Sequence, residues 1–213
     1  MLLLSALTAP AFAAEKPVTI VALGDSLTAG YLLGPDEGFV PQLQKRLRAK
    51  GHDVVVIDGG VSGDTTSGGL SRLDWTVGPD ADAVILELGA NDALRGIDPK
   101  LTRANLEAIV TQLRKRGLPI LLAGMIAPPN MGADYARNFN AIFPELAAEH
   151  KLLFYPFFLD GVAGELNGKP VAPGLTLADG MHPNAKGVSI IAARIAPKVE
   201  ALIGELGARP AAK

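Results

Sequence analysis

The chain has 213 residues, of which 48% are hydrophobic, which suffices for one α/β domain with a sizeable core. Lys and Arg total 20 against 22 for Asp and Glu, and this net charge of −2 argues against a nucleic-acid surface and against strong attraction to anionic lipid. Cysteine is absent, so disulfides, thiolate chemistry and cysteine-ligated metals are excluded.

The N-terminal segment has the pattern of a secretory signal peptide. Residues 2–7 are mostly apolar, and Ala11-Phe12-Ala13 matches the small-x-small pattern that precedes cleavage. The positively charged start of such a signal is missing, so residues 1–13 are either a truncated signal or a short disordered arm. No later stretch has the roughly 18 consecutive apolar residues of a membrane-spanning helix. We therefore expect an exported protein, periplasmic or secreted, with one domain over residues 14–206 and a frayed tail at 207–213.

Apolar runs that predict strands alternate along the chain with amphipathic runs that predict helices. Because the first four apolar runs are nearly continuous, they indicate strands covered on both faces, as in a parallel sheet. The pattern predicts a three-layer α/β/α domain, with Pro144 arguing against the continuity of its fourth helix. The expected strands are 18–23, 53–58, 83–88, 119–125 and 152–155, and the expected helices are 38–49, 65–76, 99–116, 135–149 and 185–206.

Ser26 is the candidate nucleophile, since Gly24-Asp25-Ser26-Leu27 follows the first predicted strand directly. In parallel sheets, ligands bind outside the carboxyl ends of the strands, where this hydroxyl is expected to lie. The alternative is that Ser26 only caps a helix. The Gly-x-Ser-x-Gly pattern of α/β-hydrolases is absent here, because Thr28 occupies the second glycine position.

His182 is the candidate general base among three histidines. Asp179 precedes it by three residues, so one turn can bring the carboxylate to Nδ1 and leave Nε2 free to face Ser26. An exposed loop histidine without a catalytic role is the alternative. We expect the other two, His52 in a polar turn and His150 at a helix end, to be structural or solvated.

Two further loops at strand ends offer donors for an oxyanion. Gly63 follows the second strand and lets backbone approach a substrate closely, and Asn91 follows the third and carries a side-chain amide. The backbone N–H of Ser26 is a third donor, although ordinary turns also explain both loops. Asp25, Asp64 and Asp92 are expected to be structural carboxylates that bind backbone N–H groups or cap helices. No metal-binding or phosphate-binding motif is recognisable, so we expect neither metal nor cofactor.

Taken in order, these segments resemble the four blocks of the SGNH (GDSL) hydrolase superfamily. The match extends through Thr28-Ala29-Gly30-Tyr31 and Leu94-Arg95-Gly96, spans roughly residues 17–205, and is similar to exported bacterial arylesterases, acyl-CoA thioesterases and lysophospholipases. The resemblance implies a flavodoxin-like five-stranded parallel sheet of order 2-1-3-4-5. It also implies a nucleophile at Ser26, a base at His182 oriented by Asp179, and oxyanion donors at Ser26, Gly63 and Asn91.

The sequence thus predicts a serine hydrolase that cleaves acyl or aryl esters or thioesters, with small molecules, lipids among them, as substrates. Apolar side chains near the expected site are candidates for the acyl pocket, although core packing explains them equally well: Leu94, Ile97, Ile126, Pro128 and Phe157. A carbohydrate O-deacetylase on the same scaffold and a non-catalytic binding module are the alternatives. No nucleic-acid partner is expected, and the sequence does not indicate an oligomeric state.

Overall fold

The computed structural model describes residues 16–164 and 173–207. The predicted signal peptide and residues 208–213 of the predicted tail lie outside these ranges. Gly207, the first residue of that tail, is the last residue of the final helix. Within the described residues, none of the helices combines the length and the apolar character that a membrane crossing requires.

Five parallel strands form one sheet in the order β2-β1-β3-β4-β5, which confirms the predicted fold and strand order. The inner strands β1, β3 and β4 are buried almost throughout because helices cover both faces, whereas the edge strands β2 and β5 are partly exposed. The register pairs Gly24 with Gly60, so the loops after β1 and β2 leave the sheet side by side. The strands are β1 (Val18–Gly24), β2 (Val54–Gly60), β3 (Ala83–Glu87), β4 (Ile120–Ala123) and β5 (Leu153–Tyr155).

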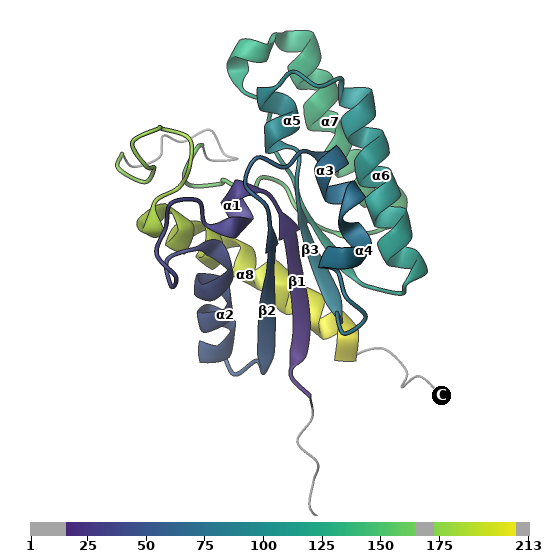
Figure 1. The fold of residues 1–213 in the computed structure, drawn as a ribbon, viewed down its shortest axis with the longest axis vertical. Coiled ribbons are helices and arrows are strands. Elements are labelled where there is room, and N and C mark those ends of the chain that lie inside the picture. The colour runs from purple at the N-terminus through teal and green to yellow at the C-terminus, as the bar shows by residue number, and fades with distance from the viewer. Residues whose placement is uncertain (1–15, 165–172, 208–213) are drawn as a thin grey trace, which may run out of the picture.

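The larger helices form two layers around the sheet: α2 and α8 pack on one face, and α3, α6 and α7 on the other (Figure 1). Their apolar faces supply the core, with Leu43 and Leu47 of α2 and Ile195 and Val199 of α8 fully buried. The helices are α1 (Ser26–Ala29), α2 (Phe39–Ala49), α3 (Thr66–Ser71), α4 (Leu73–Thr76), α5 (Ala90–Leu94), α6 (Pro99–Lys115), the 3-10 turn η1 (Pro129–Met131), α7 (Ala133–His150) and α8 (Ala185–Gly207).

Two predicted helices differ from the observed ones. The helix expected over 65–76 is divided into α3 and α4 at Arg72, whose side chain binds the carbonyl oxygens of Gly24 and Gly59 and the Asp64 carboxylate. Its N-cap is Thr65 rather than Asp64, because Asp64 is held by that ion pair. The expectation that Pro144 interrupts the fourth helix was wrong: α7 continues through it, since tertiary packing of the helix outweighs the lost hydrogen bond.

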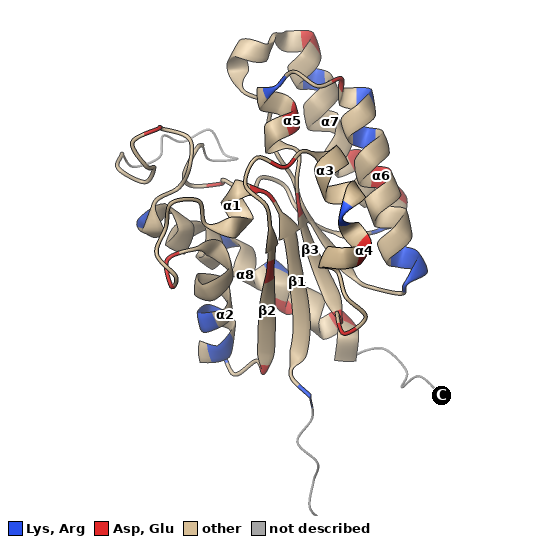
Figure 2. Ribbon diagram, viewed as in Figure 1, with Lys and Arg blue, Asp and Glu red and all other residues tan. Residues whose placement is uncertain are grey.

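Short helices at the strand ends were not predicted at all. Both α1 and α5 begin within three residues of the end of a strand and are too short to show a helical period. Together with the loops after β1, β2 and β3 they lie at the upper ends of these strands in Figure 1. Acidic segments lie at these strand ends beside α1, whereas positively charged segments lie mainly on the surrounding helices (Figure 2). The carboxyl ends of the central strands therefore carry the polar groups that the sequence singled out.

Candidate active site

Ser26 lies at the start of α1, just after β1, and is 8% exposed. Asp25 precedes it as the N-cap, and the Asp25 carboxylate accepts a hydrogen bond from the Leu27 N–H at 3.0 Å. The tight turn requires glycine at position 24, because a Cβ there would lie 2.0 Å from Thr28 Oγ1 and 2.6 Å from Glu87 Oε2. Strand β1 and the Asp25 cap thus place the Ser26 hydroxyl at the carboxyl end of the sheet.

His182 and Asp179 meet Ser26 across 156 positions of sequence. The Nε2 atom of His182 lies 2.9 Å from Ser26 Oγ, and its Nδ1 lies 2.6 Å from Asp179 Oδ2. The second Asp179 oxygen accepts hydrogen bonds from the backbone N–H groups of Met181 and His182. This turn fixes the carboxylate against the imidazole, so a continuous Asp–His–Ser chain of hydrogen bonds is in place.

The Asp179 carboxylate stays ionised far into the acid range. Its hydrogen bond to His182, followed by those from the Met181 and His182 backbone, lowers the pKa of Asp179 to about 2. An ionised carboxylate only accepts, and therefore Nδ1 carries a proton and Nε2 is the atom that can take a proton from Ser26. The arrangement can perform nucleophilic catalysis.

Of the three residues expected to donate hydrogen bonds to the oxyanion, two line the cavity beside the catalytic candidates and one does not. Ser26 and Asn91 both line one cavity, and Asn91 Nδ2 donates to Asp25 Oδ2 at 3.1 Å. Gly63 adopts a φ of +85°, which its lack of a side chain allows, but it does not line the cavity. Its carbonyl accepts a hydrogen bond from Arg95 Nη2 at 2.7 Å, which ties the Gly63 loop to the end of α5.

A largely apolar cavity of about 670 Å³ opens beside Ser26 and His182. Four of the five side chains expected at an acyl pocket line it, namely Leu94, Ile126, Pro128 and Phe157. Ile97 does not, and its carbonyl instead accepts a hydrogen bond from the Tyr135 hydroxyl. Leu27 and Met181 also line the cavity and were not predicted to, although each adjoins a catalytic candidate in the sequence. A cavity of this size and character fits an acyl or aryl group.

A buried carboxyl pair lies beneath the nucleophile turn. Asp25 and Glu87 are both fully buried, and Glu87 Oε2 accepts from the Thr28 hydroxyl at 2.7 Å and lies 3.4 Å from the Asp25 nitrogen. Burial raises the pKa of Asp25 to about 6, and burial together with the neighbouring Asp25 charge raises the pKa of Glu87 well above its ordinary value. Glu87 was not predicted as part of this site, although an acidic residue in an otherwise apolar strand is an unusual signal.

The other two acidic residues of these loops make structural contacts: Asp92 binds a backbone N–H group as expected, whereas Asp64, among the described residues, neither binds a backbone N–H group nor caps a helix and instead pairs with a side chain. Asp92 accepts hydrogen bonds from the Thr66 backbone N–H at 2.8 Å and the Thr102 hydroxyl at 3.1 Å, so it joins α3, α5 and α6. Asp64 forms an ion pair with Arg72 at 2.5 Å. These contacts fix the two loops that follow β2 and β3.

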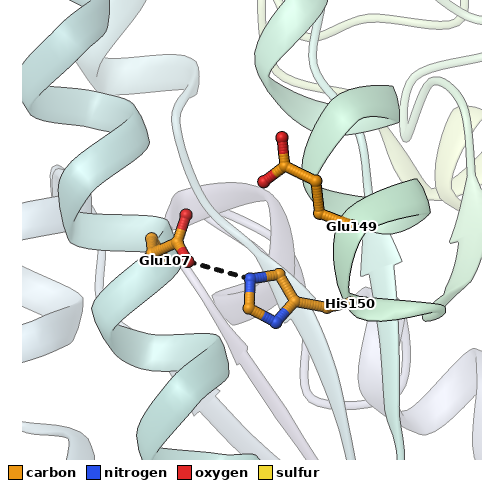
Figure 3. Close-up of side chains that lie close together, drawn as sticks. All are labelled: Glu107, Glu149 and His150. Atoms are coloured by element: carbon orange, nitrogen blue, oxygen red, sulfur yellow. Dashed lines mark hydrogen bonds and ion pairs between the residues drawn. The ribbon is translucent and has the colours of Figure 1, made fainter.

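One group of metal-ligating side chains lies away from this site, between α6 and α7 (Figure 3). His150 Nε2 lies 3.0 Å from Glu107 Oε1, and Glu149 is the third member. Arg103 already holds Glu149 by two hydrogen bonds, at 2.6 and 2.8 Å, and reaches Glu145 as well. Because a guanidinium satisfies these carboxylates, we assign the group to helix–helix contact and not to metal binding.

The α/β/α fold together with the Asp–His–Ser chain is the arrangement of a serine hydrolase. Comparison with known proteins shows the family. The chain belongs to the GDSL-like Lipase/Acylhydrolase family, which matches residues 22–190 and confirms the resemblance inferred from the motifs. AlinE4, an SGNH-hydrolase family esterase of known crystal structure, superposes with a TM-score of 0.73 and 41% identity, covering 89% of this chain and 98% of that chain.

Three characterised bacterial relatives span most of the chain. Esterase TesA of Pseudomonas aeruginosa is 39% identical over 166 residues, covering 78% of this chain and 79% of that protein. An arylesterase of Vibrio mimicus is 35% identical over 200 residues, covering 93% and 95%. Thioesterase 1/protease 1/lysophospholipase L1 of Escherichia coli K12 is 33% identical over 193 residues, covering 90% and 88%.

Proposed function

We propose that this protein is a serine hydrolase that cleaves carboxylic esters through an acyl-enzyme on Ser26. The observation that carries the proposal is the chain of contacts from Asp179 through His182 to the Ser26 hydroxyl, with 2.6 and 2.9 Å between the bonded atoms. Family membership supports the same reaction class.

In the proposed mechanism, Ser26 Oγ attacks the acyl carbonyl while His182 Nε2 accepts its proton. The ionised Asp179 stabilises the imidazolium that forms. His182 then returns the proton to the leaving alcohol or thiol, and the acyl group remains on Ser26. Water, deprotonated by His182, attacks this acyl-enzyme and releases the acid with Ser26 regenerated.

The tetrahedral intermediates carry a negative oxygen that needs hydrogen-bond donors. We assign this role to the Ser26 backbone N–H and to the Asn91 side-chain amide, which both border the cavity. Gly63 is the proposed third donor, through its backbone N–H. Its carbonyl, on the other side of the residue, is anchored by Arg95.

The substrates we propose are esters and thioesters with an apolar acyl or aryl group, lysophospholipids included. Apolar side chains such as Leu94, Ile126 and Phe157 line the cavity and suit such a group better than a sugar. The printed names of the relatives, esterase, arylesterase and thioesterase/lysophospholipase, agree with this class. A carbohydrate O-deacetylase is not favoured.

Labelling with a fluorophosphonate probe tests the reaction class. We expect intact protein to gain one adduct at Ser26, and Ser26→Ala to lose both the adduct and ester turnover while remaining folded. An unlabelled wild-type protein with no turnover would favour a binding module and remove the hydrolase assignment.

A series of p-nitrophenyl esters from acetyl to palmitoyl, measured beside acetylated xylan and an acyl-CoA, tests the substrate class. We expect turnover of the synthetic esters, with KM falling as the acyl chain begins to fill the cavity. Activity confined to acetylated xylan would overturn the substrate assignment while leaving Ser26 as the nucleophile.

We also propose export, with cleavage after Ala13 and a single hydrolase domain over residues 14–206. The support is the small-x-small sequence Ala11-Phe12-Ala13. Intact-mass measurement of protein recovered from the periplasm or medium should give an N-terminus at Ala14. Recovery of the uncut chain from the cytoplasm alone would contradict it.

A further inference from the structure

The Asp25 carboxylate touches both the nucleophile turn and the amide assigned to the oxyanion. Its Oδ1 accepts from the Leu27 N–H at 3.0 Å, and its Oδ2 accepts from Asn91 Nδ2 at 3.1 Å. We propose that Asp25 is a positioning residue that fixes which end of the Asn91 amide faces the substrate. The inference rests on the proposed ester hydrolysis.

An asparagine amide has two ends of nearly equal shape and opposite hydrogen-bonding character. The nitrogen donates two hydrogen bonds, whereas the oxygen only accepts. If Asn91 turned over, its carbonyl oxygen would face the developing oxyanion and would repel it. An ionised Asp25 can only accept, and therefore it selects the orientation in which Nδ2 faces it. The second Nδ2 hydrogen remains for the substrate oxygen.

The surroundings of Asp25 explain how a charge can reside there. Asp25 is fully buried, but its carboxylate has two N–H donors, from Leu27 and Asn91. Its neighbour Glu87 is also fully buried, and Glu87 Oε1 has no hydrogen-bond partner among the described residues. Two adjacent buried carboxyl groups do not both ionise readily. Asp25, whose carboxylate accepts two N–H hydrogen bonds, carries the charge, and Glu87 is the neutral member of the pair.

The charged and titratable groups that face Asp25 come from three other elements. They are Glu87 at the end of β3, Asp64 in the loop after β2, and His182 in the loop before α8. A protonated His182 stabilises the ionised form of Asp25, whereas negative charges on Asp64 and Glu87 destabilise it. The dominant favourable contacts are the two hydrogen bonds, so the Asn91 amide and the Asp25 charge stabilise each other.

A double-mutant cycle between positions 25 and 91 tests the coupling. Asp25→Asn keeps a good helix cap but can donate as well as accept, so it no longer selects one amide orientation. We expect Asn91→Ala to lower kcat about 10²–10³-fold, and Asp25→Asn to lower kcat at least about tenfold with little change in KM. In the Asn91→Ala background, Asp25→Asn should cost less than about twofold more. Equal losses in both backgrounds would overturn the inference.

Glu87→Gln is the matched control, because it changes the other carboxyl of the pair without touching Asn91. We expect its kcat to stay within about twofold of the wild type. A loss in Glu87→Gln as large as that in Asp25→Asn would assign the effect to packing under the turn, against the inference.

A measurement on the wild-type chain covers the case in which Asp25→Asn does not fold. In a crystal structure of the phosphonate adduct on Ser26, Asn91 Nδ2 should lie within about 3.1 Å of both the phosphonyl oxygen and Asp25 Oδ2. An adduct whose oxygen is bound while Nδ2 points elsewhere would refute the role of Asp25 and leave the hydrolase intact. Failure of Ser26 to label at all would count against the hydrolase itself, so the two failures are distinguishable.

Discussion

The ring of Tyr31 lies against the imidazole of His182, with 4.5 Å between the ring centroids and 38° between the planes. Tyr31 is 40% exposed and follows α1 directly, so the segment that carries the nucleophile also supports the base. This contact restricts the imidazole on the side of its face, whereas Asp179 and Ser26 restrict it through its edge.

Removing this ring should weaken catalysis without removing the nucleophile. Aromatic pairs of this kind are worth about 0.5–1.5 kcal/mol, so Tyr31→Ala is expected to lower kcat roughly 2- to 12-fold. Tyr31→Phe keeps the ring and should stay near the wild-type kcat. Steady-state kinetics on a p-nitrophenyl ester measure both variants, and an equal loss in the two would point to the Tyr31 hydroxyl instead of its ring.

We expect Asp179 to support catalysis by selecting the His182 tautomer that carries its proton on Nδ1. Asp179→Asn can donate a hydrogen bond to Nδ1, which would place the imidazole proton on Nε2 and prevent it from accepting the Ser26 proton. We expect kcat to fall about 10²–10⁴-fold with KM nearly unchanged. Rapid-quench labelling with a fluorophosphonate should slow in parallel. Unchanged labelling together with slow turnover would restrict Asp179 to deacylation.

The contact between Arg95 and the Gly63 carbonyl should hold one proposed donor loop in place. A hydrogen bond of this kind contributes about 0.5–1.5 kcal/mol, so Arg95→Met is expected to lower kcat/KM roughly 2- to 12-fold. Arg116 makes the same type of contact, to the Gly78 carbonyl at 2.8 Å, near the start of β3 and away from the site. Arg116→Met is therefore the control, and an equal effect of both variants would deny Arg95 a specific role.

Glu87→Gln should stabilise the protein more as the pH rises. Because the folded-state pKa of Glu87 is raised, the native state holds this proton at pH values where the unfolded chain has lost it. The wild type therefore loses free energy of unfolding above the ordinary glutamate pKa, by up to about 1.4 kcal/mol per pH unit, and glutamine does not titrate. Urea unfolding at pH 4 to 8 should give equal stabilities at the acid end and a growing advantage for Glu87→Gln above it. A constant difference across the range would exclude this ionisation.

Acid should reduce kcat through two groups. His182 must be unprotonated to act as a base, and Asp25, whose pKa is raised to about 6, must be ionised to orient Asn91. Asp179, with its pKa near 2, keeps its charge through this range. Log kcat should therefore fall more steeply below about pH 6 in the wild type than in Asn91→Ala, in which the charge on Asp25 has no amide to orient. An equally steep fall in both proteins would separate Asp25 from the amide.

The fold and the chemical class could be predicted from the sequence alone. The runs that become β1, β3 and β4 are almost continuously apolar and are buried on both faces, so local pattern and tertiary packing favour the same structure. Ser26, Asn91 and His182 stand in short motifs next to strand or helix ends, where a parallel sheet brings loops together. Family motifs supplied the strand order, which periodicity does not carry.

The surroundings of these motifs depend on contacts between residues far apart in the sequence. The Asp25–Glu87 pair, the tilted contact of Tyr31 with His182 and the hydrogen bond from Arg95 to Gly63 join residues that are 62, 151 and 32 positions apart. The division of a helix at Arg72 and the continuity of α7 through Pro144 likewise depend on contacts with other elements. Burial, charge and hydrogen bonding act through space, and a pattern read along the chain records only neighbours in sequence.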